Sequence, residues 1–215
     1  MTPLVVVLSA PSGGGKTTIT QALLAGRKDI GYSVSATTRT PRPGERDGDA
    51  YHFLSREEFQ RRWDRGEFLE SAEYAGERYG TLKSEVDRVL AAGRHVVLDI
   101  EVQGARAVRR AYPPPRSVSI FIVPPSAEVL IERLRGRNTE TGETLARRLD
   151  RAIWEVQQAS EYEHLVVNDV LADAVRDVGT IITEGGRVAH RGPPGLAGRI
   201  LEGLTREAER LRRNS

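Results

Sequence analysis

The chain of 215 residues contains no cysteine and carries a formal net charge of +2, with a sequence pI of about 9.1. This composition excludes disulfides, thiol catalysis and cysteine-based metal sites, and so mild a charge does not by itself indicate a nucleic-acid partner. The length predicts one domain. Because no signal peptide and no apolar run of roughly 18 residues occurs, we expect a cytoplasmic protein without a membrane partner.

The first predicted elements are a strand and a helix joined by glycines. The run LVVVLS (4–9) is short, apolar and rich in β-branched residues, as in a buried strand. After the glycines, KTTITQALLAG (16–26) places Ile19, Leu23 and Leu24 on one helical face and ends on Gly26.

The joining loop nearly matches the phosphate-binding template Gly, four residues, Gly-Lys-Ser/Thr, with Ala10 in place of the first glycine. The glycines at 13–15 let backbone N–H groups wrap a phosphate at a helix N-terminus. Lys16 is then expected to reach the β- and γ-phosphates and Thr17 to ligate Mg²⁺. The alternative is a flexible glycine turn, which the strand–loop–helix context disfavours.

The stretch from Ser33 to Thr81 is polar and lacks long apolar runs. It has the composition of an inserted substrate-binding lobe, with one predicted helix at REEFQRRW (56–63). Arg39 and Arg42 lie three residues apart in a proline-held extended loop, so they can grip a second phosphate. Tyr51 and Tyr79 can add hydroxyl donors, and we expect Glu70 and Thr81 near the same site. Taken singly, each tyrosine is better explained as a half-buried packing residue, and only together with the loop do they indicate an anion site.

Beyond this lobe, apolar runs alternate with helical patterns. Strands are predicted at 95–100, 117–123 and 164–168, followed by helices at about 103–112, from 126 onward, and at 171–182. This alternation predicts a parallel sheet wrapped by helices, with ligands at the carboxyl ends of the strands. Asp99 and Asn168 lie at such ends. The four histidines are scattered without metal-ligand spacing, so we expect them to be structural or exposed.

Two segments have several interpretations. RLRGRNTETGETLARRLDR (133–151) concentrates arginine on two predicted helices and a turn; it is either a solvated charged face or a clamp for transferring phosphates. The tail from Gly185 reads as a linker followed by an amphipathic helix that docks, dimerises or frays.

At these residues the sequence closely resembles the guanylate kinase family, from about Val5 to Ile182. The shared motifs include SAPSGGGKTT, SVSATTRTPRPGE, YHF, GEFLE, YGT, LDIEVQGA, IFIVPPS, RLRGR and VVND. The resemblance implies an α/β fold of the P-loop NTPase type that transfers the γ-phosphoryl of ATP to GMP, and to dGMP, with Mg²⁺. It further implies a core (1–32, 82–135, 152–184), a monophosphate-binding lobe (33–81), a lid (136–151) and an extension (185–215).

The resemblance also assigns roles to individual residues. For ATP it implies Ser12, Gly13, Gly14, Gly15, Lys16, Thr17, Thr18, Arg133 and Asn168. For GMP it implies Ser35, Arg39, Arg42, Tyr51, Glu70, Tyr79, Thr81 and Asp99. For catalysis it implies Lys16, Arg39, Arg137 and Arg148, with the metal on Thr17 and on Asp99 through water. The chain departs from the family pattern at Ala10, at Glu101 (often Asp) and at GRN (136–138, more commonly Gly-Arg-Gly).

The chemistry of Glu70 fits this assignment. A carboxylate accepts two parallel hydrogen bonds from N1–H and the exocyclic amine of guanine, whereas adenine would leave it unpaired. The acceptor phosphate is already ionised near neutral pH, because its second pKa is about 6. Alignment and charge neutralisation therefore suffice, and no general base is needed.

Two other functions fit parts of the pattern. A kinase of ribose phosphates would use the same scaffold but would not need Ser35, Glu70 and Thr81 to read a base. A non-catalytic module that binds phosphorylated peptides is expected to lack the loop lysine and to stand among other interaction domains. The presence of Lys16 and Thr17 favours an enzyme, and the sequence leaves its oligomeric state open.

Overall fold

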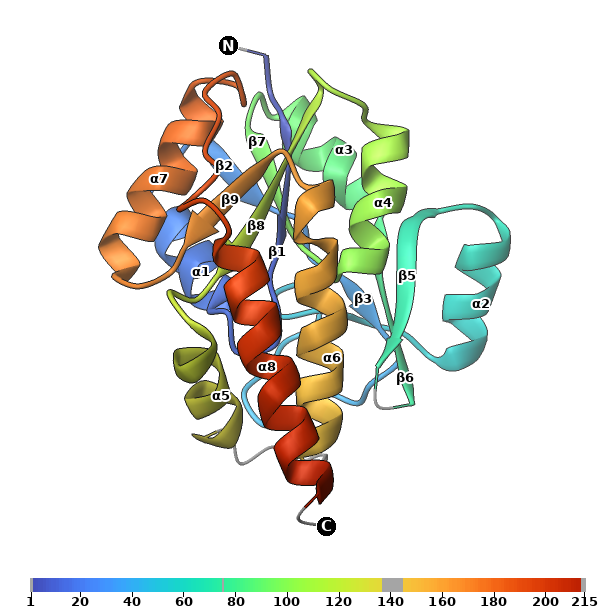
Figure 1. Cartoon of the computed structure of the whole chain (residues 1–215). Helices are drawn as coiled ribbons and strands as arrows, with labels where there is room; N and C mark the ends of the chain where they lie inside the picture. Colours follow the sequence, from blue (N-terminus) through green and yellow to red (C-terminus); the bar gives the residue numbers. More distant parts are fainter. Residues whose placement is uncertain (1, 75, 137–144, 214–215) are drawn as a thin grey trace. The chain divides into compact units, whose positions relative to one another are not determined.

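A computed structural model describes residues 2–74, 76–136 and 145–213 (Figure 1). The strands are β1 (Val5–Ser9), β2 (Ile30–Tyr32), β3 (Ala36–Thr37), β4 (His52–Phe53), β5 (Phe68–Tyr74), β6 (Glu77–Leu82), β7 (His95–Asp99), β8 (Ser117–Val123) and β9 (His164–Val167). The helices are α1 (Lys16–Gly26), α2 (Arg56–Asp64), α3 (Lys83–Ala91), α4 (Val102–Ala111), α5 (Ala127–Gly136), α6 (Leu145–Gln157), the 3-10 helix η1 (Gln158–Glu161), α7 (Leu171–Thr183) and α8 (Leu196–Arg213).

The predicted central sheet is present, with the strand order β2-β7-β1-β8-β9. In this sheet β2 pairs with β7 and β8 pairs with β9 in parallel, as the alternation of strands and helices requires. Strands β1 and β8 are buried along their whole length, which explains their continuous apolar sequences. The observed bounds of β1, β7, β8 and β9 agree with the predicted strands to within one residue.

By its contacts the chain divides into two compact units, and each is described by itself. Unit 1 comprises Met1–Val7 and Leu24–Val118, and unit 2 comprises Leu8–Leu23 and Ser119–Ser215. The acceptor-site residues predicted from the sequence all fall in unit 1. The phosphate loop, Arg133, Arg148 and Asn168 fall in unit 2. The predicted boundaries of core, lobe and lid stay predictions, and half of the lid (137–144) lies outside the described residues.

Unit 1 contains a second sheet that the sequence did not reveal. Its strand order is β4-β3-β6-β5, and β5 and β6 form an antiparallel hairpin (Figure 1). The predicted helix α2 is confirmed and packs Phe59 against Phe68 of β5, with ring centroids 4.4 Å apart. Ala36, Phe59, Phe68 and Leu82 form a small buried core here.

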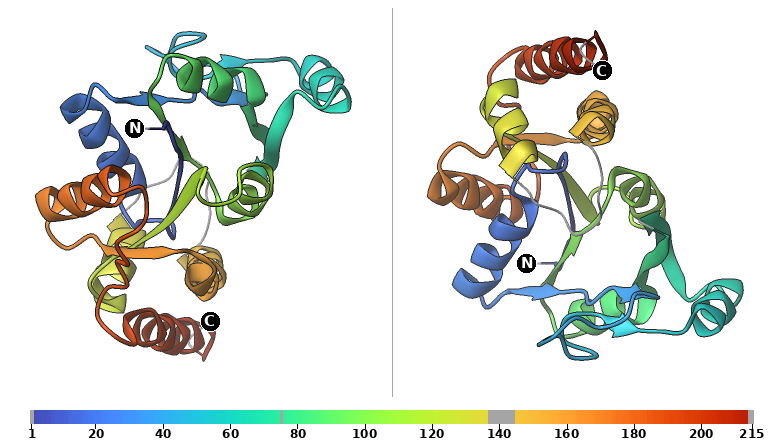
Figure 2. Two further views of the ribbon diagram at one scale, coloured as in Figure 1. Left: turned by 90° about the horizontal axis from the view of Figure 1, so that it is seen from above. Right: turned by 90° about the horizontal axis from the view of Figure 1, so that it is seen from below.

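In unit 2 the C-terminal helix docks, which selects one of the three behaviours considered for the tail. Helix α8 lies alongside α6 and reaches α5, as two views of the molecule agree (Figures 1 and 2). It buries Leu196, Ile200, Leu204 and Ala208. A side chain at Gly203 would come within 2.4 Å of the Ala127 Cβ, so glycine permits the close approach of α8 to α5.

Candidate active site

The phosphate loop in unit 2 has the conformation that its glycines allow. Gly13 and Gly15 adopt φ values of 82° and 90°, a left-handed region that side chains rarely tolerate. Ala10 is buried, and a Cβ on Gly14 would lie 2.8 Å from its methyl group. The absence of a side chain at Gly14 therefore leaves room for alanine at the loop's first position.

Lys16, Thr17 and Thr18 form the first turn of α1, directly after the loop. At this end of a helix the N–H groups point outward and the dipole favours an anion. Thr17 and Thr18 are exposed. The described residues contain no cluster of three or more metal-ligating side chains.

Asn168 follows β9 and contacts the loop. Its side-chain Nδ2 donates to the backbone oxygen of Gly14 at 2.9 Å, and the residue is buried. A Cβ on Gly15 would lie 2.1 Å from the same Nδ2, so glycine is required there on steric grounds as well. Arg133 of α5 donates from Nη2 to the Asn168 backbone oxygen at 3.4 Å. The structure thus brings Arg133, Asn168 and the loop together.

Arg148, predicted to act in catalysis, contacts α5. Arg148 of α6 is buried, and its Nη1 donates to the backbone oxygen of Leu134 at 3.0 Å. In this conformation its guanidinium contacts the end of α5. Arg137 lies outside the described residues.

In unit 1 a buried carboxylate marks the predicted base-reading site. Glu70 of β5 is 7% exposed and Thr81 of β6 is 1% exposed, and the two face each other in the antiparallel register. The Thr81 hydroxyl donates to Glu70 Oε1 at 2.6 Å. A Cβ on Gly104 of α4 would lie 2.4 Å from Glu70 Oε2, so Gly104 leaves the space that the carboxylate occupies. Ser35 lies half-buried next to β3.

Arg39, Tyr51 and Tyr79 form a cluster in the same unit. The Tyr51 and Tyr79 rings meet edge to face at 5.8 Å, and the Arg39 guanidinium lies 5.4 Å from the Tyr51 centroid. Arg39 Nη2 donates to both carboxylate oxygens of Glu45 at 2.8 and 2.9 Å. This hydrogen bonding raises the pKa of Arg39 and lowers the pKa of Glu45. Glu45 also accepts from the backbone N–H of Arg42, whose side chain is exposed.

Asp99 ends β7, as predicted, and is half-buried beside tyrosines. Burial raises the pKa of Tyr32, and the charge of Asp99 adds to that rise. Burial likewise raises the pKa of Tyr51, with smaller contributions from Tyr79 and Asp99. Both phenols therefore stay protonated at neutral pH and can donate hydrogen bonds.

Sequence reasoning missed four residues at these sites: Tyr32, Glu45, Gly104 and Glu155. Glu45 and Gly104 stand inside motifs quoted above, TTRTPRPGE and LDIEVQGA, but received no role. Tyr32 ends a strand too short to recognise. Glu155 stands on the buried face of α6, where a charged residue at an otherwise apolar helical position was the available signal.

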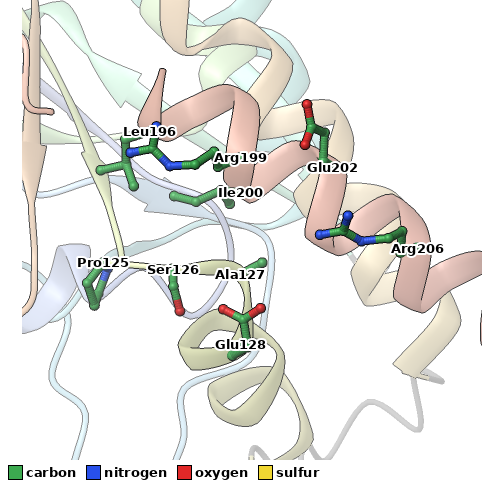
Figure 3. A pocket seen from close by; sticks show the side chains of 9 residues that line it. All are labelled: Pro125, Ser126, Ala127, Glu128, Leu196, Arg199, Ile200, Glu202 and Arg206. Atoms are coloured by element: carbon green, nitrogen blue, oxygen red, sulfur yellow. The ribbon is translucent and has the colours of Figure 1, made fainter. Parts of the chain in front are cut away.

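A separate pocket of about 290 Å³ lies between α8 and the start of α5 (Figure 3). Its lining residues are Pro125, Ser126, Ala127, Glu128, Leu196, Arg199, Ile200, Glu202 and Arg206. None of the predicted site residues lines it. We attribute this pocket to the docking of α8.

Strand β1, the loop with its two left-handed glycines and helix α1, together with the parallel sheet, define a fold of the P-loop NTPase type. The guanylate kinase family model matches residues 2–185. The chain is 47% identical to a guanylate kinase of Trichormus variabilis over 173 residues (80% of this chain, 86% of the relative). It is 49% identical to one of Symbiobacterium thermophilum over 179 residues (83% and 84%).

A solved guanylate kinase structure from Anaplasma phagocytophilum has the same fold, with a TM-score of 0.69 and 29% identity over 98% of this chain and 95% of that one. The chain belongs to the guanylate kinase family, and it is a nucleotide-binding kinase. Within the described ranges, no helix is both long and apolar enough to cross a membrane.

Proposed function

We propose that this enzyme transfers the γ-phosphoryl of ATP to GMP, and also to dGMP, giving ADP and GDP. The observation that carries the proposal is the buried Glu70 carboxylate, held by the Thr81 hydroxyl and given room by Gly104. A carboxylate oxygen has two lone pairs, so Glu70 Oε1 can accept from Thr81 and from a ligand together. Guanine offers the matching donors, N1–H and the exocyclic amine.

The acceptor phosphate is proposed to bind Arg39, Arg42, Tyr51 and Tyr79, with Ser35 completing the guanine contacts. Glu45 supports this role, because its carboxylate orients the Arg39 guanidinium and the backbone of Arg42. An arginine keeps five N–H donors in a rigid fork, so it can serve a carboxylate on one side and a phosphate on another. The two neutral tyrosines add hydroxyl donors.

On the donor side, residues 12–18 are proposed to hold the ATP phosphates, with Lys16 neutralising charge between the two nucleotides. Thr17, and Asp99 through water, would hold Mg²⁺, which supplies charge neutralisation on the phosphate oxygens when it is bound. Arg133 and Asn168 are proposed to lie beside the adenine, and Arg137 and Arg148 to act from the lid. We also propose that the enzyme is cytoplasmic.

One assay tests the function. ADP formation from ATP is measured with GMP, dGMP, IMP, AMP and ribose phosphates as acceptors, with and without Mg²⁺. We expect turnover with GMP and dGMP, little with AMP, and none without the metal. Preference for a ribose phosphate would replace the proposed acceptor, and no turnover with any acceptor would favour a binding module.

A further inference from the structure

Helix α6 reaches the phosphate loop with a buried carboxylate. Glu155 is 2% exposed, and its Oε2 accepts from the backbone N–H of Ser12 at 2.9 Å. A buried carboxylate is costly unless hydrogen bonds stabilise its charge. The loop N–H supplies one such bond, so the loop and the carboxylate stabilise each other.

Two further bonds hold the same loop. The Gly14 N–H donates to the Pro11 backbone oxygen at 2.8 Å, and Asn168 Nδ2 donates to the Gly14 oxygen at 2.9 Å. Three hydrogen bonds therefore hold the loop: one within the loop, one from Asn168 after β9, and one to Glu155 of α6. Its left-handed glycines have few steric constraints of their own, so these bonds define its shape.

We propose that Glu155 is a positioning residue for the donor nucleotide, an inference that rests on the proposed binding of ATP at this loop. Through Ser12 it fixes the entry to the glycines whose N–H groups are to bind phosphate. Glu155 shares the buried face of α6 with Arg148, seven residues earlier and about 10 Å along the helix. The same helix thus joins the phosphate loop to an arginine of the proposed lid.

The alternative is that the carboxylate stands in for a phosphate and must leave when ATP binds. The position of Ser12 argues against this. Ser12 precedes the three glycines, so a carboxylate bound to its N–H does not occupy the N–H groups of Gly13 and Gly15. Glu155 should therefore strengthen nucleotide binding, whereas a stand-in would weaken it.

The test compares two variants of the full-length enzyme. Glu155→Met has similar length and no acceptor oxygen, whereas Glu155→Gln keeps an oxygen that can accept from Ser12. We expect kcat/KM for ATP to fall about ten- to hundredfold in Glu155→Met and to recover most of the loss in Glu155→Gln. KM for GMP should change by less than about twofold in both. ADP binding, measured by calorimetry without turnover, should weaken in parallel.

Glu163 provides a matched control in the same unit. Its Oε2 accepts from the Ser119 N–H at 2.9 Å and from the Ser119 hydroxyl at 3.0 Å, away from the loop. Glu163→Met should lower Tm and leave ADP binding unchanged. The inference is overturned if Glu155→Met binds ADP as wild type does or more tightly, if Glu155→Gln is as impaired as Glu155→Met, or if Glu163→Met weakens ADP binding equally.

A failure of the proposed function can be distinguished from a failure of the inference about Glu155. Wild-type enzyme that binds ADP but does not phosphorylate GMP would refute the acceptor assignment. The effect of Glu155 on ADP binding would still decide the inference in that case.

Discussion

The two candidate sites use backbone and side chains in opposite ways. In unit 1 the proposed recognition group is a side chain, Glu70, and paired strands and a helical glycine hold it in place. In unit 2 the proposed recognition group is the backbone of the glycine loop, and the side chains of Asn168 and Glu155 hold it in place. Changes in unit 1 should therefore alter which acceptor is used. Changes at the loop should lower the rate of phosphoryl transfer to every acceptor by the same factor.

The largest effect is expected at the loop. Lys16→Met removes the positive charge that is proposed to neutralise the transferring phosphate, and one such contact is typically worth about 10²–10³ in kcat. The loss should be equal for GMP and IMP, because Lys16 does not read the base. Single-turnover kinetics on both acceptors, with a melting curve and GMP binding as controls, measure this. A change in the GMP/IMP ratio, or turnover near wild type, would contradict the assignment.

Glu70→Gln tests the acceptor site of unit 1, where a change should alter the preference among acceptors. Glutamine keeps the size but places an NH₂ donor against a guanine donor, which costs roughly 1–3 kcal/mol, or one to two decades in kcat/KM for GMP. GMP and dGMP should suffer alike, since the ribose is not involved. IMP keeps N1–H and lacks the exocyclic amine, so its activity should fall less and the GMP/IMP ratio should narrow. An unchanged ratio would remove Glu70 from base recognition.

Gly104→Ala should produce a weaker version of the same change. The new methyl would lie 2.4 Å from Glu70 Oε2, so the carboxylate must move while the fold can remain. We expect about a tenfold loss of kcat/KM for GMP and a narrower GMP/IMP ratio. Gly198→Ala is the control, because this helical glycine of α8 has open space around its Cβ position. If both variants keep the wild-type ratio, Gly104 does not shape the base site.

The sequence predicts the central sheet well and the second sheet poorly. β1 and β8 are buried on both faces and read as unbroken apolar runs, which are easy to locate. β3 and β4 have two residues each, and β2 has three, too few for any periodicity to emerge. Local sequence pattern therefore locates the long buried strands and misses the strands of two or three residues.

The same limit applies to the sites. The loop could be recognised from adjacent residues, and its strand–loop–helix context is confirmed by the observed β1 and α1. The bonds that hold it join residues 143 and 154 positions apart, from Ser12 to Glu155 and from Gly14 to Asn168. Such contacts depend on how helices and strands pack in three dimensions, which the spacing of residues along the sequence does not predict. Asn168 is among the candidates because it ends a predicted strand and belongs to the motif VVND, not because its contact with the loop could be foreseen.

The smallest predicted effect is a loss of thermal stability at acid pH, to which one histidine in each unit contributes. His95 in unit 1 and His164 in unit 2 are buried, and each accepts a backbone N–H on Nδ1, from Leu4 at 3.1 Å and from His190 at 3.3 Å. Burial lowers the pKa of both imidazoles below the usual 6.5. Protonation of Nδ1 would also remove each acceptor.

The sign of the pH effect follows from these lowered pKa values. The unfolded chain takes up protons at a higher pH than the folded one, so the stability contribution is complete above about pH 6.5 and is lost as the pH falls toward the folded pKa values. Tm should therefore decline by a few degrees between about pH 7.5 and 5.5. This range lies above 4.5, where glutamates such as Glu45 and Glu77 with lowered pKa values contribute fully. Replacing both histidines with asparagine, whose amide oxygen can still accept, should flatten the profile, and an equally steep decline in that variant would assign the acid sensitivity to other groups.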